Sequence, residues 1–466
     1  MLPAVLAVAA AGCLAAALHR PPTAAASAGP ASAGAADAAG AAVVSASRLP
    51  VAASRLAGDV NLGAAVDAAL TSPAVAARPA CVEVDDGGVS VYRRDATTPL
   101  IPASNLKLLT ATAALERLGP AATFTTTAVA AAPVRGGVLA GPLYLVGGGD
   151  PLLATDGYRA SLHQWTESRE PITRLATLAD AVAAAGVTHI TGGILADDNR
   201  YDGVRTVASW APSYLADGEV APVGALVVDG GTVVAGSRRV PARDPALTAT
   251  SAFEGLLAER GITVDGRVTR GTAPAGAVRV AAVQSPPLTT VVGEMLRESD
   301  NLAAEMLVKE LGYRFGGGGS WAAGTGVVHA TLAAAGVPLD GVVQLDGSGL
   351  DRQDRVPCQT LAALLATGTL EPFFPVAARC GTLVGRMVGQ PAAQRVVAKT
   401  GSLAGVSALS GAVGPAALPS QPCPPAGASA EPVTFSIVFN GLPSTAAGEA
   451  VEDRIADALA AYAQGT

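Results

Sequence analysis

Two residue types that can perform acyl transfer lie close together in the stretch "PASNLK". Ser104 and Lys107 are three residues apart, which places both side chains on one face of a helix, about one turn apart. A neutral lysine amine at that distance can remove the serine hydroxyl proton and make the oxygen a nucleophile. If Ser104 begins the helix, the helix dipole favours the developing alkoxide. Taken alone, such a pair is more often a helix-capping serine beside a solvated lysine.

Two further motifs, Ser299-Asp300-Asn301 and Lys399-Thr400-Gly401, follow along the chain. The 31 Lys plus Arg residues include only three lysines, which are Lys107, Lys309 and Lys399. Arginine does not give up its proton in a protein, so a lysine in such an arginine-rich chain indicates a position where arginine cannot serve. Each motif alone can be a turn, a cap or a hairpin edge. All three in this order favour a catalytic set.

The second motif can complete the proton transfers. Ser299 can relay a proton to a leaving amine, and the Asn301 amide can bind the substrate backbone and orient Lys107. The four histidines, which are His19, His163, His189 and His329, are scattered, and no His/Cys cluster has zinc-ligand spacing. We therefore expect neither a metal nor a histidine base, and no cofactor is implied.

The third motif can bind the substrate. Lys399 and Thr400 present a cation and a hydroxyl to a carboxylate, and Gly401 is expected to leave room for substrate along a strand edge. The backbone N–H groups of Ser104 and Ser402 would form an oxyanion hole.

The elements that position these motifs can be read from hydrophobic patterns. Asp59 is expected to cap a helix in which Leu62, Val66 and Leu70 share one face. A hairpin follows, then the helix of the first motif, which ends near Leu118. Thr-, Val- and Gly-rich runs fill about residues 121–282, helical segments return after 283, and three strands and a closing helix end the chain. This order predicts an α/β layer fold interrupted by a mainly β insert.

Composition limits the possible functions. At 466 residues, the chain is long enough for two or three domains. The net charge of −7 and the absence of a basic cluster argue against nucleic-acid binding.

The first 18 residues form an apolar run typical of an export signal, although no charged segment precedes it. We expect residues 1–19 to be a signal peptide or a membrane anchor, with lipidation at Cys13 as a further alternative. Residues 20–57 read as a disordered linker. The domain should therefore lie outside the cytoplasm, where disulfides form. Cys81, Cys358, Cys380 and Cys423 allow three pairings, of which we favour Cys358 with Cys380 because they bracket one helical segment.

The ordered S-x-x-K, S-x-N and K-T-G motifs resemble the signature of serine penicillin-recognising enzymes. About 195 residues separate Ser104 from Ser299, so an additional module must be inserted between them. In this layout the chain resembles the class C low-molecular-mass penicillin-binding proteins, the D-alanyl-D-alanine carboxypeptidase/endopeptidase family. Supporting segments are "LYLVGGGDPLL", "RESDNLAAEML", "DGSGLDR" and "KTGSLAGVSALSG".

The resemblance covers roughly residues 58–463. It implies a transpeptidase-like α+β fold, which residues 58–120 and 283–466 form and in which helices flank an antiparallel sheet. It also implies cleavage of peptidoglycan stem peptides through an acyl-enzyme on Ser104, with β-lactams as inhibitors. The resemblance further indicates that Ser348 and Arg352 contact the stem-peptide side chain and that Asp150 faces its ammonium end. Ordinary loop and salt-bridge roles are the alternative for these three.

Two other functions are compatible with the same motifs. A β-lactamase-like hydrolase would need an efficient deacylating base, and no glutamate-containing loop motif follows Asn301, since Glu305 and Glu310 lie in a predicted helix. A non-catalytic penicillin-binding sensor would not need an intact nucleophile and base. The sequence leaves open the oligomeric state and whether carboxypeptidase or endopeptidase action dominates.

Overall fold

The computed structural model describes residues 49–158, 172–418 and 433–465. Residues Val51–Thr466 form one compact unit. The predicted signal or anchor, with Cys13, lies outside the described residues. Within the described ranges, no helix combines the length and the hydrophobicity needed to cross a membrane.

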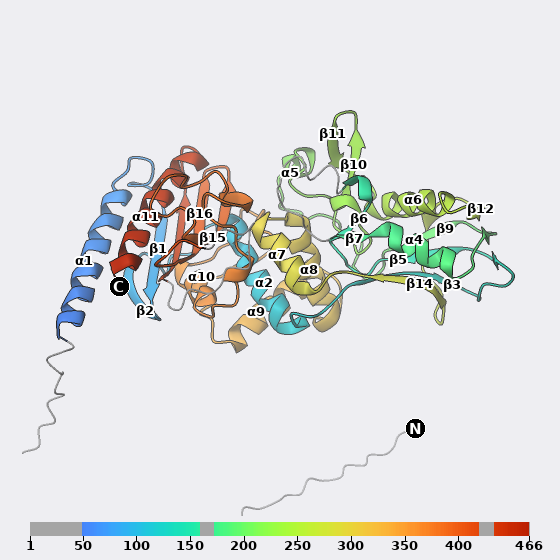
Figure 1. Cartoon of the computed structure of the whole chain (residues 1–466), viewed down its shortest axis with the longest axis horizontal. Helices are drawn as coiled ribbons and strands as arrows, with labels where there is room; N and C mark the ends of the chain where they lie inside the picture. The colour runs from blue at the N-terminus through green and yellow to red at the C-terminus, as the bar shows by residue number, and fades with distance from the viewer. Residues whose placement is uncertain (1–48, 159–171, 419–432, 466) are drawn as a thin grey trace, which may run out of the picture. The chain divides into compact units, whose positions relative to one another are not determined.

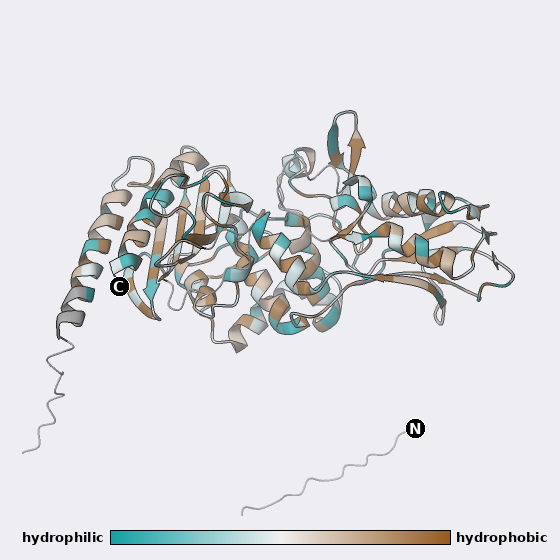
Figure 2. Cartoon of the chain, viewed as in Figure 1, coloured by the Kyte–Doolittle hydropathy of each residue, from teal (hydrophilic) through white to brown (hydrophobic). Residues whose placement is uncertain are grey.

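A five-stranded antiparallel sheet, here called the central sheet, lies between the helices of the main core (Figure 1). Its order is β15 (Val396–Leu403), β16 (Val406–Val413), β17 (Val433–Asn440), β1 (Ala80–Asp86) and β2 (Val89–Arg94). Every residue of β16 and β17 is buried, because helices cover both faces of the sheet. These strands carry mostly hydrophobic side chains (Figure 2).

Two hydrophobic clusters lie on opposite faces of this sheet. On one face, α1 (Leu49–Leu70) and α11 (Thr445–Gly465) pack against Val84, Leu409 and Ile437. On the other face, the cluster around Val397, Ala408 and Val438 includes the remaining helices of the main core. These helices are α2 (Lys107–Leu118), α7 (Leu288–Arg297), α8 (Asn301–Phe315), α9 (Trp321–Ala334) and α10 (Cys358–Leu365).

A β-rich region lies between α2 and α7. Its main sheet has the order β13 (Thr269–Arg270), β9 (Ile194–Asp197), β5 (Leu143–Val146), β3 (Thr125–Ala130) and β14 (Val278–Gln284). Helices α4 (Leu175–Ala184) and α6 (Pro245–Ala258) share its hydrophobic core. The chain leaves and returns through the antiparallel pair β3 and β14, where the Ser285 N–H donates to the Phe124 carbonyl at 2.9 Å.

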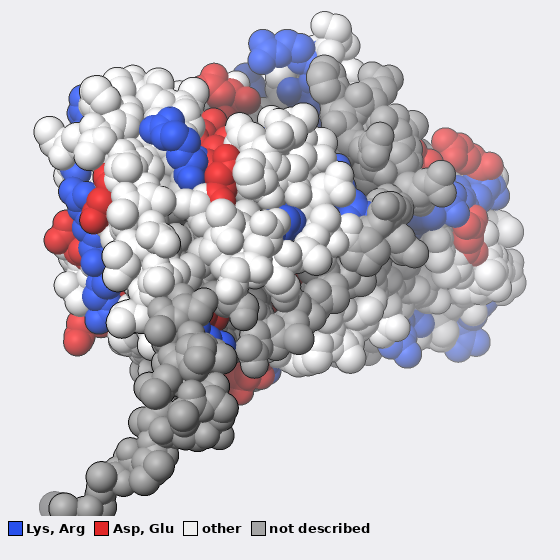
Figure 3. All heavy atoms as spheres, turned by 60° about the vertical axis from the view of Figure 1, so that its left-hand side comes forward, with Lys and Arg blue, Asp and Glu red and all other residues white. Residues whose placement is uncertain are grey.

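Short elements complete this region and the loops around the main core. The small strands are β4 (Val138–Leu139), β6 (Leu153–Ala154), β7 (Thr173–Arg174), β8 (His189–Ile190), β10 (Thr232–Ala235), β11 (Arg238–Pro241) and β12 (Thr263–Val264). The short helices are η1 (Ala103–Leu106), α5 (Pro212–Ala216), η2 (Asp229–Gly231), η3 (Glu371–Phe373) and η4 (Gly381–Leu383). On the face drawn in Figure 3, charged side chains of both signs alternate with wide neutral areas.

The first helix differs from its prediction. It begins at Leu49, inside the segment assigned to a linker (20–57), so Asp59 lies within the helix and does not cap it. The Asp59 carboxylate instead accepts a hydrogen bond from the Tyr462 hydroxyl at 2.7 Å, on the last helix of the chain. Leu62 and Val66 are buried as expected. A contact with the distant C-terminal helix is not visible in local sequence, which explains the error.

The preferred disulfide pairing is wrong. Cys358 is bonded to Cys81, with a Cα–Cα distance of 5.9 Å, and not to Cys380. Cys358 is the first residue of α10, which packs on β1 and β17, so tertiary packing brings it to Cys81. Cys380 is also in a disulfide, and Cys423 lies outside the described residues.

Candidate active site

Ser104 lies on the short helix η1, which leads directly into α2. It does not cap α2, because the N-cap position is Leu106 and no side chain caps it. The Lys107 Nζ lies 2.9 Å from the Ser104 Oγ, so the expected pair is within hydrogen-bond distance. The preceding residue, Ala103, has a φ of 46°, in the left-handed region that non-glycine residues rarely adopt. The nucleophile motif therefore sits on a strained turn.

Lys107 is fully buried and has two further partners. Its Nζ donates to the Asn301 Oδ1 at 2.6 Å and to the Ser348 carbonyl at 2.8 Å. Burial lowers the pKa of the Lys107 amine to about 8, although Glu305 and nearby carboxylates oppose this shift. A neutral amine at this position would use its lone pair to accept the Ser104 proton. The geometry and the pKa are therefore both suited to a general base.

The second motif occupies the break between α7 and α8. Ser299 has a φ of 62°, again in the left-handed region. The Asp300 carboxylate caps α8 by accepting from the Ala303 N–H at 3.0 Å. Asn301 begins α8, and its Nδ2 donates to the Glu219 carbonyl at 2.8 Å while its Oδ1 faces Lys107. This cap fixes the start of α8 and thereby the positions of the Ser299 and Asn301 side chains.

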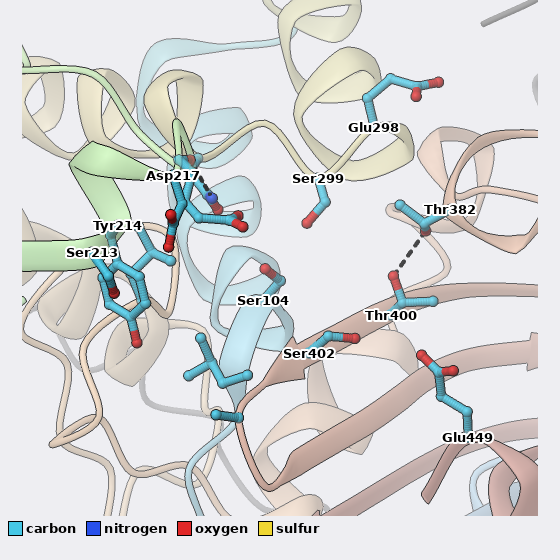
Figure 4. Close-up of a pocket in the computed structure, with 15 residues that line it drawn as sticks. Ser104, Ser213, Tyr214, Asp217, Glu298, Ser299, Thr382, Thr400, Ser402 and Glu449 are labelled. Carbon is cyan, nitrogen blue, oxygen red and sulfur yellow. Dashed lines mark hydrogen bonds between the residues drawn. The ribbon is translucent and has the colours of Figure 1, made fainter. Parts of the chain in front are cut away.

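Lys399 lies on β15, the edge strand of the central sheet. Its Nζ donates to the Ser299 Oγ at 2.9 Å and to the Thr400 carbonyl at 2.8 Å. Burial lowers the pKa of Lys399 well below its usual value, and the nearby Lys107 adds to the effect. The Thr400 hydroxyl donates to the Thr382 Oγ1 at 2.8 Å (Figure 4).

The register of β15 determines where its backbone groups point. Leu403 pairs with Val406 across a two-residue turn, so this closing pair is hydrogen-bonded and the pairs alternate along the ladder. Residues Thr400 and Ser402 then direct their N–H and C=O groups away from β16, towards the free edge. The Thr400 carbonyl does accept from Lys399 there. The Ser402 N–H thus points to the open edge of the sheet, where a donor of the expected oxyanion hole has to point.

Gly401 packs against the turn that carries Ser104. A Cβ at this position would lie 2.8 Å from the Pro102 carbonyl oxygen and 3.3 Å from the Ala103 Cβ. The side of Gly401 on which a Cβ would stand is therefore occupied by the turn that carries Ser104. The glycine allows β15 and η1 to approach closely, which brings the first and third motifs together.

The remaining three residues singled out from the sequence lie in different surroundings. Ser348 is fully buried, and its carbonyl holds Lys107. Arg352 is exposed, and its Nη1 donates to the Ala404 carbonyl at the tip of the β15–β16 turn. Asp150 is buried, with burial raising its pKa to about 6. It accepts from the Leu152 N–H and does not line the cavity formed by the motifs.

This cavity has a volume of about 420 Å³ and connects the three motifs. Ser104, Ser299, Asn301, Thr400 and Ser402 line it, and Figure 4 shows the Ser104 and Ser299 hydroxyls facing the same space. Further lining residues, which were not among the predicted site residues, are Ser213, Tyr214, Asp217, Glu219, Glu298, Leu350, Thr382, Leu403, Ala404 and Glu449. Thr382 and the 213–219 segment belong to no motif, and only long-range packing brings them to the site.

Comparisons with known proteins place this chain in a family. The model of the D-Ala-D-Ala carboxypeptidase 3 (S13) family matches residues 62–241 and 235–462. A D-alanyl-D-alanine carboxypeptidase of Actinomadura sp. (strain R39) is 34% identical, over 85% of this chain and 84% of that protein. The carboxypeptidase DacB of Mycolicibacterium smegmatis is 31% identical, over 76% of each chain.

The crystal structure of penicillin-binding protein 4 from Haemophilus influenzae has the same fold. It covers 84% of this chain and 97% of its own, with a TM-score of 0.69 and 21% identity. Since the family model spans nearly all of the described unit, the chain belongs to the D-Ala-D-Ala carboxypeptidase 3 (S13) family.

Proposed function

We propose that this protein is a serine DD-peptidase that cleaves D-Ala-D-Ala in peptidoglycan stem peptides. The observation that carries the proposal is the Lys107 amine, which lies 2.9 Å from the Ser104 hydroxyl with a pKa lowered to about 8. A pair of this kind can form an acyl-enzyme. The named activity of the relatives, D-alanyl-D-alanine carboxypeptidase, supports the same reaction.

Acylation follows from the positions of four groups. The Ser104 Oγ attacks the carbonyl carbon of the penultimate D-alanine and transfers its proton to the Lys107 Nζ. The negative oxygen that forms is stabilised by the backbone N–H groups of Ser104 and Ser402. The proton then passes to the leaving nitrogen through Ser299, and the C–N bond breaks. Water hydrolyses the resulting ester and releases the shortened peptide.

The third motif would bind the terminal carboxylate. Lys399 supplies the cation, and Thr400 supplies a hydroxyl. Thr382, which already bonds Thr400 at 2.8 Å, adds a second hydroxyl beside it. A bound carboxylate would favour the charged form of Lys399 and offset its burial. Arg352 and Ser348 remain proposed contacts for the stem-peptide side chain, Arg352 through its exposed guanidinium and Ser348 through the loop it supports.

Crosslinked D-Ala-diaminopimelate peptides are a proposed second substrate, cleaved by the same acyl-enzyme. We place the reaction outside the cytoplasm, with residues 1–19 as signal or anchor; the buried disulfide between Cys81 and Cys358 supports that location. The division into a penicillin-binding domain (58–120 and 283–466) and an insert (121–282) is also proposed. It is supported by the pairing of β3 with β14, which brings the two ends of the insert together.

The proposal is tested by incubating the wild type and Ser104→Ala with benzylpenicillin and measuring intact mass. We expect one adduct on the wild type and none on Ser104→Ala. Ser213→Ala, which alters another serine of the same cavity, should still form the adduct. An adduct on Ser104→Ala would refute the assignment. Rapid loss of the wild-type adduct would favour a β-lactamase instead, and D-alanine release from a pentapeptide would exclude a non-catalytic sensor.

A further inference from the structure

A fully buried carboxylate lies behind the candidate base. Glu305, in the second turn of α8, is 0% exposed. Its Oε1 accepts from the Ser348 N–H at 2.8 Å, and its Oε2 accepts from the Gly347 N–H at 2.9 Å and the Trp321 Nε1 at 2.6 Å. All three partners are neutral donors. Burial raises the pKa of this carboxyl to about 8, so holding it ionised here is costly and the arrangement needs a reason beyond stability.

The contacts of Glu305 lead directly to the base. Ser348 donates its N–H to Glu305, and its carbonyl accepts from the Lys107 Nζ at 2.8 Å. The next N–H, that of Gly349, belongs to the same planar peptide as this carbonyl and donates to the Asp346 Oδ1 at 2.7 Å. The peptide units on both sides of Ser348 are therefore each held by a buried carboxylate.

The loop also makes close contacts that fix its position. A Cβ at residue 347 would lie 2.4 Å from the Ala304 carbonyl oxygen, and one at residue 349 would lie 1.9 Å from the Ala103 carbonyl oxygen. The loop is thus packed between α8 and the turn of Ser104. Little movement is possible unless the hydrogen bonds to the carboxylates are lost.

We propose that Glu305 is a positioning residue, whose carboxylate fixes the Ser348 carbonyl and thereby holds the Lys107 amine opposite Ser104. This inference rests on the proposed role of Lys107 as the base. Glu305 touches neither substrate nor nucleophile, and its effect passes through the loop. In its ionised form, its negative charge also acts on the Lys107 amine across the buried site.

The charges that face Lys107 come from several elements. Glu305 on α8 has the largest effect in favour of the protonated amine, followed by Asp346 in the loop, Asp300 at the α8 cap and Glu219 from the β-rich region. The cation that faces this cluster from β15 is Lys399, whose own pKa is lowered by burial first and by Lys107 second. Burial raises the pKa of Glu305 itself to about 8, so its charge is present in the range where Lys107 titrates and above it, and removing that charge should lower the pKa of Lys107 further. The neutral amine would then be present at lower pH.

The test uses Glu305→Gln in the full chain, with benzylpenicillin as the probe and the acylation rate constant followed by intact mass from about pH 5 to 10, a range around the lowered lysine pKa. Glutamine has nearly the same shape as glutamate. Its amide nitrogen is a donor, however, and would face N–H groups that now donate to the Glu305 carboxylate. We expect the maximal rate to fall about 10- to 100-fold, since a small displacement of a catalytic group has effects of this size. The acidic limb of the profile should move to lower pH.

Glu310→Gln is the matched control. Glu310 lies on the same helix and is equally buried, but it pairs with Arg200 and Arg314, away from the loop. Its replacement should leave the midpoint of the pH profile unchanged. Glu305→Asp, which keeps the charge, should restore the wild-type midpoint. A wild-type rate and midpoint in Glu305→Gln would overturn the inference while leaving the proposed function intact.

If Glu305→Gln does not fold, Trp321→Phe removes one donor to Glu305 and retains a ring in the core. We then expect a several-fold lower acylation rate, and an unchanged rate would count against the inference. The wild-type protein, measured in the same series, separates the inference on Glu305 from the proposed function. Absence of any wild-type adduct would refute the proposed function itself, and the inference with it.

Discussion

At the scale of single residues, all three lysines of the chain are completely buried. Lys107 and Lys399 each face a serine hydroxyl at 2.9 Å. Lys309 instead binds Asp202 and the Val204 carbonyl, and its Nζ lies 3.9 Å from the centre of the Trp321 ring. A slender amine fits each of these narrow sites, whereas the wider guanidinium of arginine would need more space and more acceptors. The rarity of lysine was therefore informative for all three positions.

Lys107 should give the acylation rate a definite pH dependence. The base is active only when neutral, and burial places its pKa at about 8, so the rate should rise with pH and level off above that value. Lys107→Arg retains the charge but cannot act as a base, and should lower acylation by about 10²- to 10⁴-fold. The measurement is the acylation rate constant with benzylpenicillin as a function of pH.

Lys399→Arg provides the comparison, because it retains a cation for the substrate carboxylate. We expect the acylation rate of Lys399→Arg to fall less than that of Lys107→Arg. Equal, small losses in both variants would mean that Lys107 is not the base.

At the scale of elements, local patterns predicted the central part of the fold well. The three strands and the closing helix expected at the end of the chain are β15, β16, β17 and α11, and the helix expected to end near Leu118 does end there. These elements have strong periodicity and clear turn residues. Ser104, Lys107, Ser299 and Lys399 could be singled out as candidates because the spacing within each motif is a local property, and the structure brings them together.

The elements that the sequence did not predict depend on distant contacts. Thr382 reaches the site through its bond to Thr400, and Glu219 does so through Asn301. Cys358 meets Cys81 across 277 residues. The two glycines of "DGSGLDR" read as an ordinary turn, but Gly349 is required because the loop packs directly on the Ala103 carbonyl. No local pattern contains this information.

Gly349→Ala should therefore separate η1 from the loop that holds Lys107. The new Cβ would lie 1.9 Å from the Ala103 carbonyl oxygen, in a residue with a φ of 83°. We expect a loss of several kcal/mol in the free energy of unfolding, with about 1–2 kcal/mol from the left-handed backbone alone. Acylation at a temperature where the variant is folded should also slow. Urea denaturation and the benzylpenicillin rate measure the two effects.

Gly276→Ala isolates the contribution of the backbone. Gly276 has a similar φ of 77°, but a Cβ there would meet no atom within 4 Å. Gly276→Ala should therefore lose only the part of the free energy of unfolding that comes from the left-handed backbone, and its acylation rate should not change. The explanation by close packing would be wrong if both variants lost the same stability and kept the same rate.

At the scale of the whole molecule, the β-rich region is joined to the catalytic core by more than its two connecting strands. Arg200 binds Glu310 at 2.6 Å, and the Tyr201 hydroxyl donates to the Met306 carbonyl at 3.1 Å, both on α8. The Trp210 Nε1 donates to the Asp346 Oδ2 at 2.8 Å, beside the loop that holds Lys107. Residues about 200 to 220 thus form part of the catalytic environment, although they lie far from every motif.

The disulfide joins the two halves of the core in a similar way. Cys81 on β1 and Cys358 on α10 are both 0% exposed and close a loop with a sequence separation of 277, which includes Ser104, Ser299 and the entire β-rich region. Closing such a long loop restricts the unfolded chain and is worth about 5 kcal/mol in the chain-entropy model.

Cys81→Ala/Cys358→Ala should therefore unfold at a clearly lower urea concentration, while the benzylpenicillin acylation rate of the folded protein stays near the wild-type value, since neither cysteine lines the cavity. The single variant Cys81→Ala also lacks the cross-link, so its difference from the double variant isolates the packing of one side chain. A double variant with the wild-type urea midpoint would show that this cross-link contributes nothing to the stability of the folded chain.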